Sequence, residues 1–286
     1  MRASSYVAMG GLMGFPLLGK SSAQTPEKSR AVLVRNKDVL DRQGQPRFSV
    51  LQEMLDQAVS SLLEAPDPES AWKQLVKPSD VVGIKTNAWH YLPTPRALEQ
   101  SIHRRVMDVG VKEENLDVDD RGVLENPVFE RATALINARP MRAHHWSGLG
   151  TLLKNYIMFV SRPFRYHGNA CERLGAIWQL PKVKGKTRLN VLVMLTPLFH
   201  GIGPHHFSSR YTWPYRGIIV STDPVAADAT GARIIQAKRD NFFGEEKPIS
   251  PPPLHIAAAD TRFGLGNSRP ERIQLVKLGW GEDMFI

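Results

Sequence analysis

The sequence predicts an α/β fold, in which a mostly parallel, twisted sheet is flanked by helices in a single large domain. Short aliphatic runs alternate with longer runs whose apolar residues recur every three or four positions, which is typical of strands joined by helices. The composition, 42% hydrophobic and 23% charged over 286 residues, is that of a globular chain long enough to bury a large core. It excludes collagen, a coiled coil and wholesale disorder.

Four strands and two helices are predicted in the first half of the chain. Residues 31–36 form an aliphatic run typical of a strand. Residues 49–64 show the clearest helical spacing, and Ser49 with Gln52 fits a capping box at the start of this helix. Residues 80–87 are apolar without alternation, as in a strand buried on both faces. The same patterns predict a helix at 95–109 and strands at 115–120 and 133–138.

The second half predicts two helices and three strands. An apolar run at 148–160 reads as a helix that carries Lys154. A second helix begins at Asp223 and Pro224, because Asp suits the N-cap position and Pro the first helical position. Strands are expected at 189–196 and 216–222, which are rich in β-branched residues, and an edge strand at 272–279; residues 161–188 and 240–253 match neither pattern.

The charge favours an anionic partner only in a general way. The chain has 37 Lys and Arg against 28 Asp and Glu, a net charge of +9, which suits anionic ligands but also an ordinary solvated basic surface. No helix-turn-helix, zinc-finger or RNA-binding signature is present, so nucleic acid is not an expected partner. The single cysteine, Cys171, excludes an internal disulfide and a Cys-ligated iron–sulfur cluster in this chain, and its setting suits a small core residue.

Residues 1–23 resemble the end of an export signal. The apolar run at 6–19 is too short to span a bilayer, and the small residues at 21–23 fit a cleavage site. The segment resembles the tail of a twin-arginine signal, which predicts a translation start upstream of Met1; a Sec signal and an apolar arm are the alternatives. We therefore expect a mature domain over 24–286 in the periplasm or outside the cell, with no transmembrane helix.

Polar side chains follow five of the predicted strands. Ligands of open α/β sheets bind at the carboxyl ends of the strands, so these side chains are expected to line one pocket. Polar strand ends are common in all proteins, which is the alternative explanation. The residues are Lys85, Thr86, Asn87, Asp119, Asp120, Arg121, Arg142, His144, His145, His200, Ser221, Thr222 and Asp223.

These residue types suggest three roles in the pocket. Cationic and amide side chains hold carboxylate or phosphate oxygens, imidazoles transfer protons near neutral pH, and carboxylates orient histidines or bind a divalent metal. We assign catalytic roles to His144, His200, Lys154 and Asp120. The expected substrate-binding residues are Lys85, Asn87, Arg121, Arg142, Asn155, Ser221 and Thr222, and the candidate metal ligands are Asp223 and Asp228. For Asp228, a contact in the core is the alternative.

Six segments together resemble a family of domains of unknown function, number 362. They are SDVVGIKTN, NLDVDDR, GLGTLLKNYI, KTRLNVLVMLTPLFHGIGP, YRGIIVSTDPVAADATGARIIQAKR and HIAAADTRFGLGNSRPERIQLVKLGW. Members of that family are often exported or found beside ferredoxin modules. Its usual Lys-x-Lys-x-His run corresponds here to Met141–His144, so one lysine is replaced by Arg or missing. The resemblance implies no particular reaction, and it implies a pocket at Lys85, Asn87, Asp120, Arg121, His144, Lys154, Asn155, His200, Asp223 and Asp228.

Two classes of function remain open. The first is an enzyme that acts on a small anionic molecule, with or without a divalent metal. The second is a non-catalytic protein that binds or matures a metal or cofactor for a redox partner outside the cytoplasm. The chain has no phosphate-binding P-loop, no Gly-x-Gly-x-x-Gly motif after a strand and no Gly-x-Ser-x-Gly motif, which disfavours nucleotide-binding and α/β-hydrolase functions.

Overall fold

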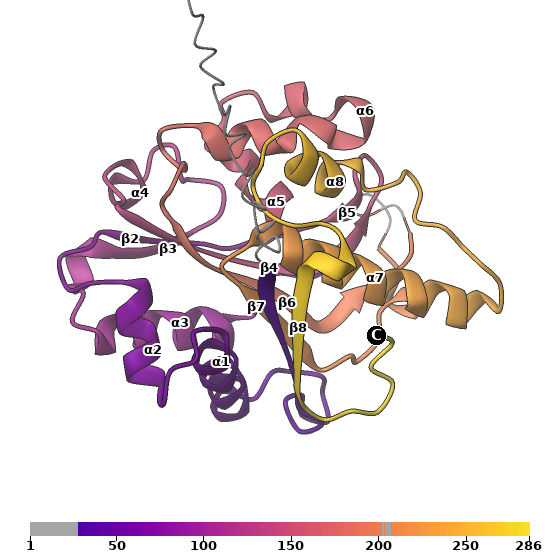
Figure 1. Ribbon diagram of the computed structural model, residues 1–286, viewed down its shortest axis with the longest axis horizontal. Coiled ribbons are helices and arrows are strands. Elements are labelled where there is room, and N and C mark those ends of the chain that lie inside the picture. Colours follow the sequence, from indigo (N-terminus) through magenta and orange to yellow (C-terminus); the bar gives the residue numbers. More distant parts are fainter. Residues whose placement is uncertain (1–27, 202, 204–206) are drawn as a thin grey trace, which may run out of the picture.

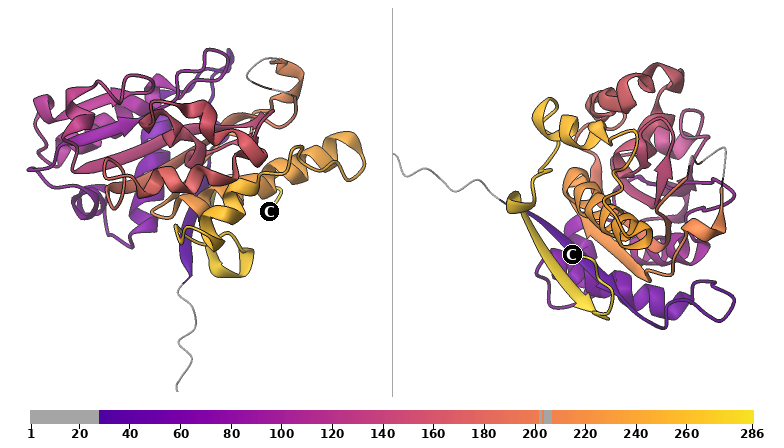
Figure 2. Two further views of the ribbon diagram at one scale, coloured as in Figure 1. Left: turned by 90° about the horizontal axis from the view of Figure 1, so that it is seen from above. Right: turned by 90° about the vertical axis from the view of Figure 1, so that its right-hand side faces the viewer.

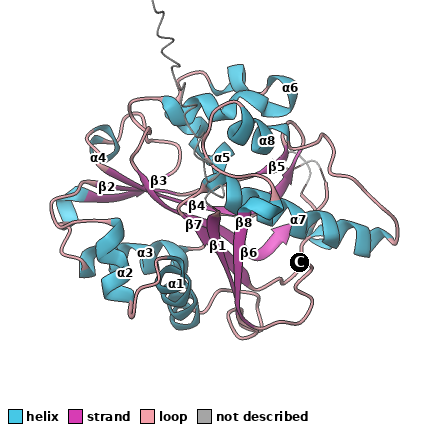
Figure 3. Cartoon of the chain, viewed as in Figure 1, coloured by secondary structure: helices cyan, strands magenta, loops and turns pink. Residues whose placement is uncertain are grey.

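The predicted α/β fold is confirmed. The computed structural model describes residues 28–201, 203 and 207–286, so the predicted export signal and the pair His205–His206 lie outside the described residues. An eight-stranded sheet runs in the order β3-β2-β4-β6-β7-β1-β8, with β5 paired to β4. The sheet lies between two groups of helices (Figure 1; Figure 3).

Seven of the eight strands were expected from the sequence, several with different bounds. The sheet is mostly parallel, with β7 antiparallel to both of its neighbours. As predicted, the last strand lies at an edge, where it pairs only with β1 (Figure 2). The strands are β1 (Ser29–Arg35), β2 (Val82–Lys85), β3 (Leu116–Asp119), β4 (Ala134–His144), β5 (Gly148–Gly150), β6 (Thr187–Leu198), β7 (Gly217–Ser221) and β8 (Ile273–Gly279).

Each face of the sheet has its own apolar core. One core packs the sheet against α1 (Phe48–Leu62), α2 (Pro68–Leu75) and α3 (Arg96–Asp108). The other packs it against α5 (Leu152–Asn155), α7 (Pro224–Phe243) and α8 (Leu254–Thr261). Two single-turn helices, α4 (Pro127–Glu130) and α6 (Gly168–Cys171), complete the second layer.

Helix α1 confirms the clearest helical prediction but not its capping box. Its N-cap is Arg47, with no side-chain capping bond. The Gln52 side chain instead donates to Asp56 one turn further along the helix, at 3.0 Å. The helix therefore depends on its buried apolar stripe rather than on a cap, as amphipathic helices in proteins generally do.

The predicted helix at 148–160 is wrong. Residues 148–150 form β5 and pair antiparallel with the end of β4, and only one turn of α-helix follows before the chain tightens into a 3-10 turn, η2 (Tyr156–Phe159). This segment is almost wholly buried, so its apolar residues reflect burial on all sides rather than one face of a helix. Strand β4 is also six residues longer at its carboxyl end than the strand predicted at 133–138.

The expectation that Ser221, Thr222 and Asp223 share the pocket edge is also wrong. Strand β7 is antiparallel to β6, and Ser221 is the register partner of Asn190, near the start of β6. The end of β7 therefore lies at the opposite edge of the sheet from the ends of β2, β3, β4 and β6. The described residues of the connection from β6 to β7 form no α-helix, whereas a parallel crossover usually needs one.

At that opposite edge, Asp223 joins three segments distant in sequence. One carboxylate oxygen caps α7 by accepting the N–H groups of Val225 and Ala226, at 2.7 and 3.0 Å. The other oxygen accepts the N–H of Asn267 at 2.8 Å and the hydroxyl of Ser29. The predicted N-cap role is confirmed, and the same carboxylate also ties α7 to β1 and to the segment before β8.

We expect Asp223→Ala to lower the free energy of unfolding by about 2–4 kcal/mol, since it removes a helix cap and two further hydrogen bonds. The matched control is Asp67→Ala. Asp67 also caps a helix, α2, but it bonds only with Ser70 nearby in the chain. Urea denaturation of both variants measures the difference. Equal losses would mean that the contacts of Asp223 with Ser29 and Asn267 add nothing.

Candidate functional site

A cavity of about 240 Å³, lined by charged, amide and aromatic side chains, lies at the carboxyl ends of β2, β3 and β4. Its size suits a small molecule. Seven of the residues predicted for the pocket line it, and seven further residues join them. The predicted ones are Asn87, Asp120, Arg121, Arg142, His144, Lys154 and Asn155; the others are Arg139, Trp89, Trp146, Ile157, Met158, Pro163 and His167.

Two arginines from one strand reach the cavity because β4 is irregular. In a regular strand, residues 139 and 142 point to opposite faces. The pairing of β4 with β6 shifts register between Pro140 and Arg142, which changes the alternation of side chains at that point. Arg139 and Arg142 can therefore both line the cavity.

A buried ion pair forms one wall of the cavity. The amine of Lys85 donates to Oδ1 of Asp120 at 2.5 Å and to the carbonyl of Thr86 at 2.7 Å. Oδ2 of Asp120 accepts the N–H of Ala88 at 2.8 Å. Burial opposes ionisation of this carboxyl, but the charge and hydrogen bond of Lys85 outweigh burial and hold the pKa of Asp120 below its ordinary value. Lys85 thus neutralises Asp120 and does not itself line the cavity.

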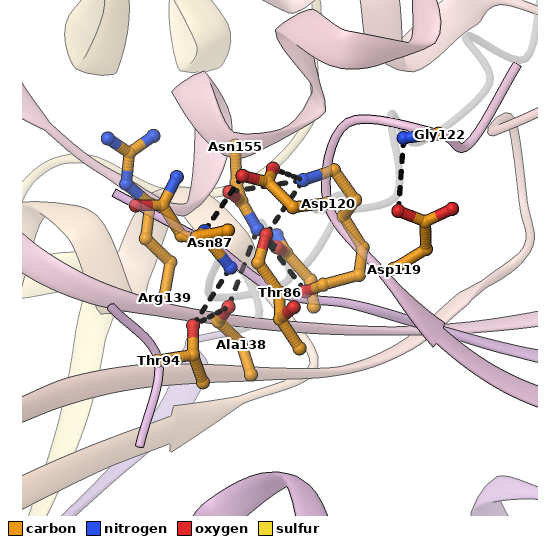
Figure 4. Close-up of polar contacts among 12 residues, drawn as sticks. Thr86, Asn87, Thr94, Asp119, Asp120, Gly122, Ala138, Arg139 and Asn155 are labelled. Carbon is orange, nitrogen blue, oxygen red and sulfur yellow. Dashed lines mark hydrogen bonds and ion pairs between the residues drawn. The ribbon is translucent and has the colours of Figure 1, made fainter. Parts of the chain in front are cut away.

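Figure 4 shows how the residues after β3 separate. Asp120 points towards Asn155, while Asp119 turns away and accepts the N–H of Gly122 at 3.0 Å. Successive residues of an extended chain point in opposite directions, so only one of these two carboxylates faces the cavity.

Asparagines connect this ion pair to the sheet. The amide of Asn155 donates to the carbonyl of Lys85 at 3.3 Å and to Oδ1 of Asn137 at 2.9 Å. Asn137 donates in turn to Asn190 on β6 at 3.1 Å and to the carbonyl of Leu152 at 3.1 Å. All three asparagines are buried, so their mutual bonds replace those that water would make.

Two buried guanidinium groups extend the cavity wall. Arg139 donates to the carbonyl of Thr151 at 3.3 Å, and Arg142 donates to Oδ1 of Asn87 at 2.8 Å while stacking over Trp89 at 4.2 Å. Within the described part of the chain, the Nε atoms of both arginines have no hydrogen-bond partner. Burial lowers the pKa of both groups, and Arg139 lowers that of Arg142 further by repulsion. Both still carry charge at neutral pH because guanidinium is so strong a base.

Lys154 is held in the cavity by the start of α5. Thr151 caps this helix, and Asp228 on α7 accepts the N–H groups of Leu152 and Leu153, both at 2.9 Å. The Lys154 side chain is buried, and its amine donates to the sulfur of Cys171 at 3.7 Å. Burial, with repulsion from the nearby arginines, lowers the pKa of Lys154 to about 8.

The cavity histidines are neutral. Nδ1 of His144 accepts the N–H of Trp146 at 3.2 Å, which leaves the ring proton on Nε2. Burial lowers the pKa of His144 far below its ordinary value, and Lys154, Arg139 and Arg142 lower it further. Burial lowers the pKa of His167 to about 4. At neutral pH, His144 is therefore a hydrogen-bond donor in this cavity, and its proton-transfer role stays a prediction.

Several predicted site residues lie elsewhere. His200 follows β6 and pairs with Arg239 on α7 at 2.9 Å instead of lining the cavity. The Ser221 hydroxyl donates to the carbonyl of Arg30 at 2.7 Å. Asp228 lies beneath α5, where burial raises its pKa to about 7 against the opposing effect of the two N–H donors. Its carboxylate anchors α5 in the core, which is the alternative that the sequence left open.

Some of the cavity residues that were not predicted had a recognisable position in the sequence. Arg139 directly follows the strand predicted at 133–138, and the proline after it argues against a continuing strand, so no local signal marked it. His167 belongs to the segment 161–188, which matched no pattern. Trp89 and Trp146 follow strand ends and could have been included on position alone.

The candidate metal ligands Asp223 and Asp228 are each held by separate N–H donors. Across residues 28–201, 203 and 207–286, no three His, Cys, Asp or Glu side chains gather in a way that could hold a metal ion. Within those same residues, no helix has the length and apolar character needed to span a bilayer.

The fold and the cavity define an α/β protein with a cation-rich cavity at the carboxyl ends of its parallel strands. Residues 114–233 match the model of the family described as a domain of unknown function (DUF362), which confirms the resemblance seen in the sequence. The matched segment extends from the start of β3 into α7 and supplies most of the cavity. No curated protein and no solved structure matches the chain.

We expect Asp228→Asn to lower the free energy of unfolding by about 1–3 kcal/mol, because an amide can accept only one of the two N–H groups and leaves the other buried donor unpaired. This change tests stability rather than chemistry. Thr230→Val is the control: it lies on the same helix and is equally buried, but its hydroxyl bonds only to the carbonyl of Ala226. Thermal unfolding checks both variants. An Asp228→Asn protein as stable as the parent would show that α5 needs no such anchor.

Proposed function

We propose that the cavity binds a small anionic molecule and that the protein is an enzyme acting on it. The observation that carries this proposal is an excess of buried positive charge. Four buried cationic side chains surround or line the cavity, but only two carboxylates are buried near them, and one of these is paired with Lys85. The cations are Lys85, Arg139, Arg142 and Lys154, and the carboxylates are Asp120 and Asp228.

Binding of an anion would offset the unfavourable electrostatic free energy of the buried cations in the unliganded protein. Burying a charge without a counter-charge is unfavourable, and here Arg139, Arg142 and Lys154 also repel one another. A carboxylate or phosphate would accept hydrogen bonds from guanidinium groups that are already fixed in place. Arginine suits such oxygens because its planar group can donate two parallel hydrogen bonds.

The groups beside the anion support an enzyme rather than a simple binding protein. The pKa of Lys154 is about 8, close enough to neutral for the amine to gain or lose a proton during a reaction. The neutral His144 ring offers a hydrogen bond to charge that develops on a bound molecule. Shifted pKa values in one small cavity are typical of active sites.

We expect inorganic phosphate or lactate to raise the melting temperature relative to chloride at the same ionic strength, because a ligand that binds only the folded state stabilises it. A ligand at 100 times its Kd adds about 2.7 kcal/mol. Arg142→Gln should weaken binding at least about tenfold, the effect of losing one charged hydrogen bond. Arg165→Gln is the control, since this exposed arginine lies outside the cavity.

One outcome of the melting experiment would exclude anion binding. If phosphate, sulfate and lactate all leave the melting temperature where chloride leaves it, the cavity binds no small anion. If they bind, incubation with a panel of small carboxylates and phosphate esters, followed by NMR, decides between the two classes of function. Binding without conversion of any compound would favour the non-catalytic alternative.

A further inference from the structure

Burial lowers the pKa of both lysines near the cavity to about 8, but their partners and positions differ. Lys85 forms an ion pair with Asp120 at 2.5 Å and does not line the cavity. Lys154 lines the cavity, and none of the ion pairs among the described residues includes it. The one hydrogen bond given for its amine goes to the thiol of Cys171, at 3.7 Å. An amine without a carboxylate partner keeps its lone pair available whenever it loses its proton.

The surroundings of Lys154 favour the loss of that proton. Burial raises the pKa of the Cys171 thiol, so this neighbour is neutral at pH 7 and offers only weak stabilisation to a positive amine. The other groups that act on the Lys154 amine are cations or neutral imidazoles: Arg139, Arg142 and His144 from β4, His167 beside α6, and His255 from α8. The carboxylate of Asp120 lines the same cavity but is paired with Lys85. With a pKa of about 8, about one Lys154 amine in ten is uncharged at pH 7.

We propose that Lys154 is the nucleophile of this cavity and forms an imine with an aldehyde or ketone that carries a carboxylate or phosphate. Arg139 and Arg142 hold the anionic group of that molecule. This inference deepens the proposed function and rests on it, because it names the carbonyl compound as the substrate class.

The step balances without any oxidant or reductant. The nitrogen lone pair forms a bond to the carbonyl carbon while the carbonyl π electrons move to oxygen, which is protonated to give a carbinolamine. The carbon–oxygen bond then breaks as nitrogen forms the double bond, and the oxygen leaves as water with the two protons that the neutral amine carried. Protonated, the imine withdraws electrons from the adjacent carbon and eases the breaking of bonds there.

The geometry supports this assignment independently of proton affinity. The amine lies on a one-turn helix whose start is fixed by Thr151 and Asp228, so its position is restricted. The arginines reach the same cavity from β4, and their unpartnered Nε atoms leave donors available for an oxyanion. A nucleophile and an anion site fixed on separate elements orient a small molecule between them.

Reductive trapping tests the proposal on the intact protein. The native chain is incubated with glyoxylate or pyruvate and sodium cyanoborohydride, digested and mapped by mass spectrometry. We expect label on Lys154 at least about tenfold above that on Lys85 in the same sample, because Lys85 lies outside the cavity and its amine is held by Asp120 and the carbonyl of Thr86. Excess lactate, which has the carboxylate but no carbonyl, should protect Lys154. Labelling of Lys154 should rise with pH and level off above about 8, whereas labelling of surface lysines should keep rising towards their ordinary pKa of about 10.4.

Two variants and one binding measurement distinguish a failure of the imine proposal from a failure of the proposed function. The Lys154→Arg variant should carry no label at position 154. Lys182 lies outside the cavity, so the Lys182→Arg variant should still be labelled at Lys154. If Lys154→Arg does not fold, lactate protection in the native protein decides the question. No label on Lys154, or label that lactate does not reduce, overturns the imine. If lactate still raises the melting temperature in that case, the anion site survives; if it does not, the proposed function falls as well.

Discussion

The structure depends most on the buried ion pair between Lys85 and Asp120. These residues come from the ends of two neighbouring strands, β2 and β3, and their contact is shielded from water. Removing one partner of a buried pair leaves an uncompensated charge, which typically costs about 3–5 kcal/mol. Asn155 and Asn137 extend the pair by hydrogen bonds to α5 and to β6. The polar network therefore sets where Lys154 lies relative to the strand ends.

The same arrangement explains why the cavity is electrostatically unbalanced. Asp120 is largely neutralised by Lys85, and the carboxylate of Asp228 is used to anchor α5. Neither is free to neutralise Arg139, Arg142 and Lys154. The fold thus tolerates a cluster of cations because a well-satisfied scaffold encloses it. Functional sites commonly retain such locally unfavourable features, and favourable interactions elsewhere in the structure offset their free energy.

Much of the fold could be predicted, because its strands and long helices have clear local patterns. The apolar stripe of α1, the Asp-Pro start of α7 and the aliphatic runs of β1, β2, β6 and β7 correspond to elements in the structure. The site was predicted less completely. Asn87, Asp120, Arg121, Arg142, His144, Lys154 and Asn155 do line one cavity, whereas His200 and the residues after β7 do not. Arg139 was missed because β4 continues through a proline and an irregular register.

By itself, the sequence determined the α/β class and most strand and helix positions, because periodicity and capping are local properties of the chain. Only the tertiary structure decided which polar residues meet. The direction of β7 depends on pairing with β6 and β1, and it moves Asp223 to the far edge of the sheet. Likewise, Lys85 ends one apolar run and Lys154 lies within another, and neither local setting reveals the partner of its amine. One meets a carboxylate and the other a thiol, because ion pairing depends on distances across the folded chain.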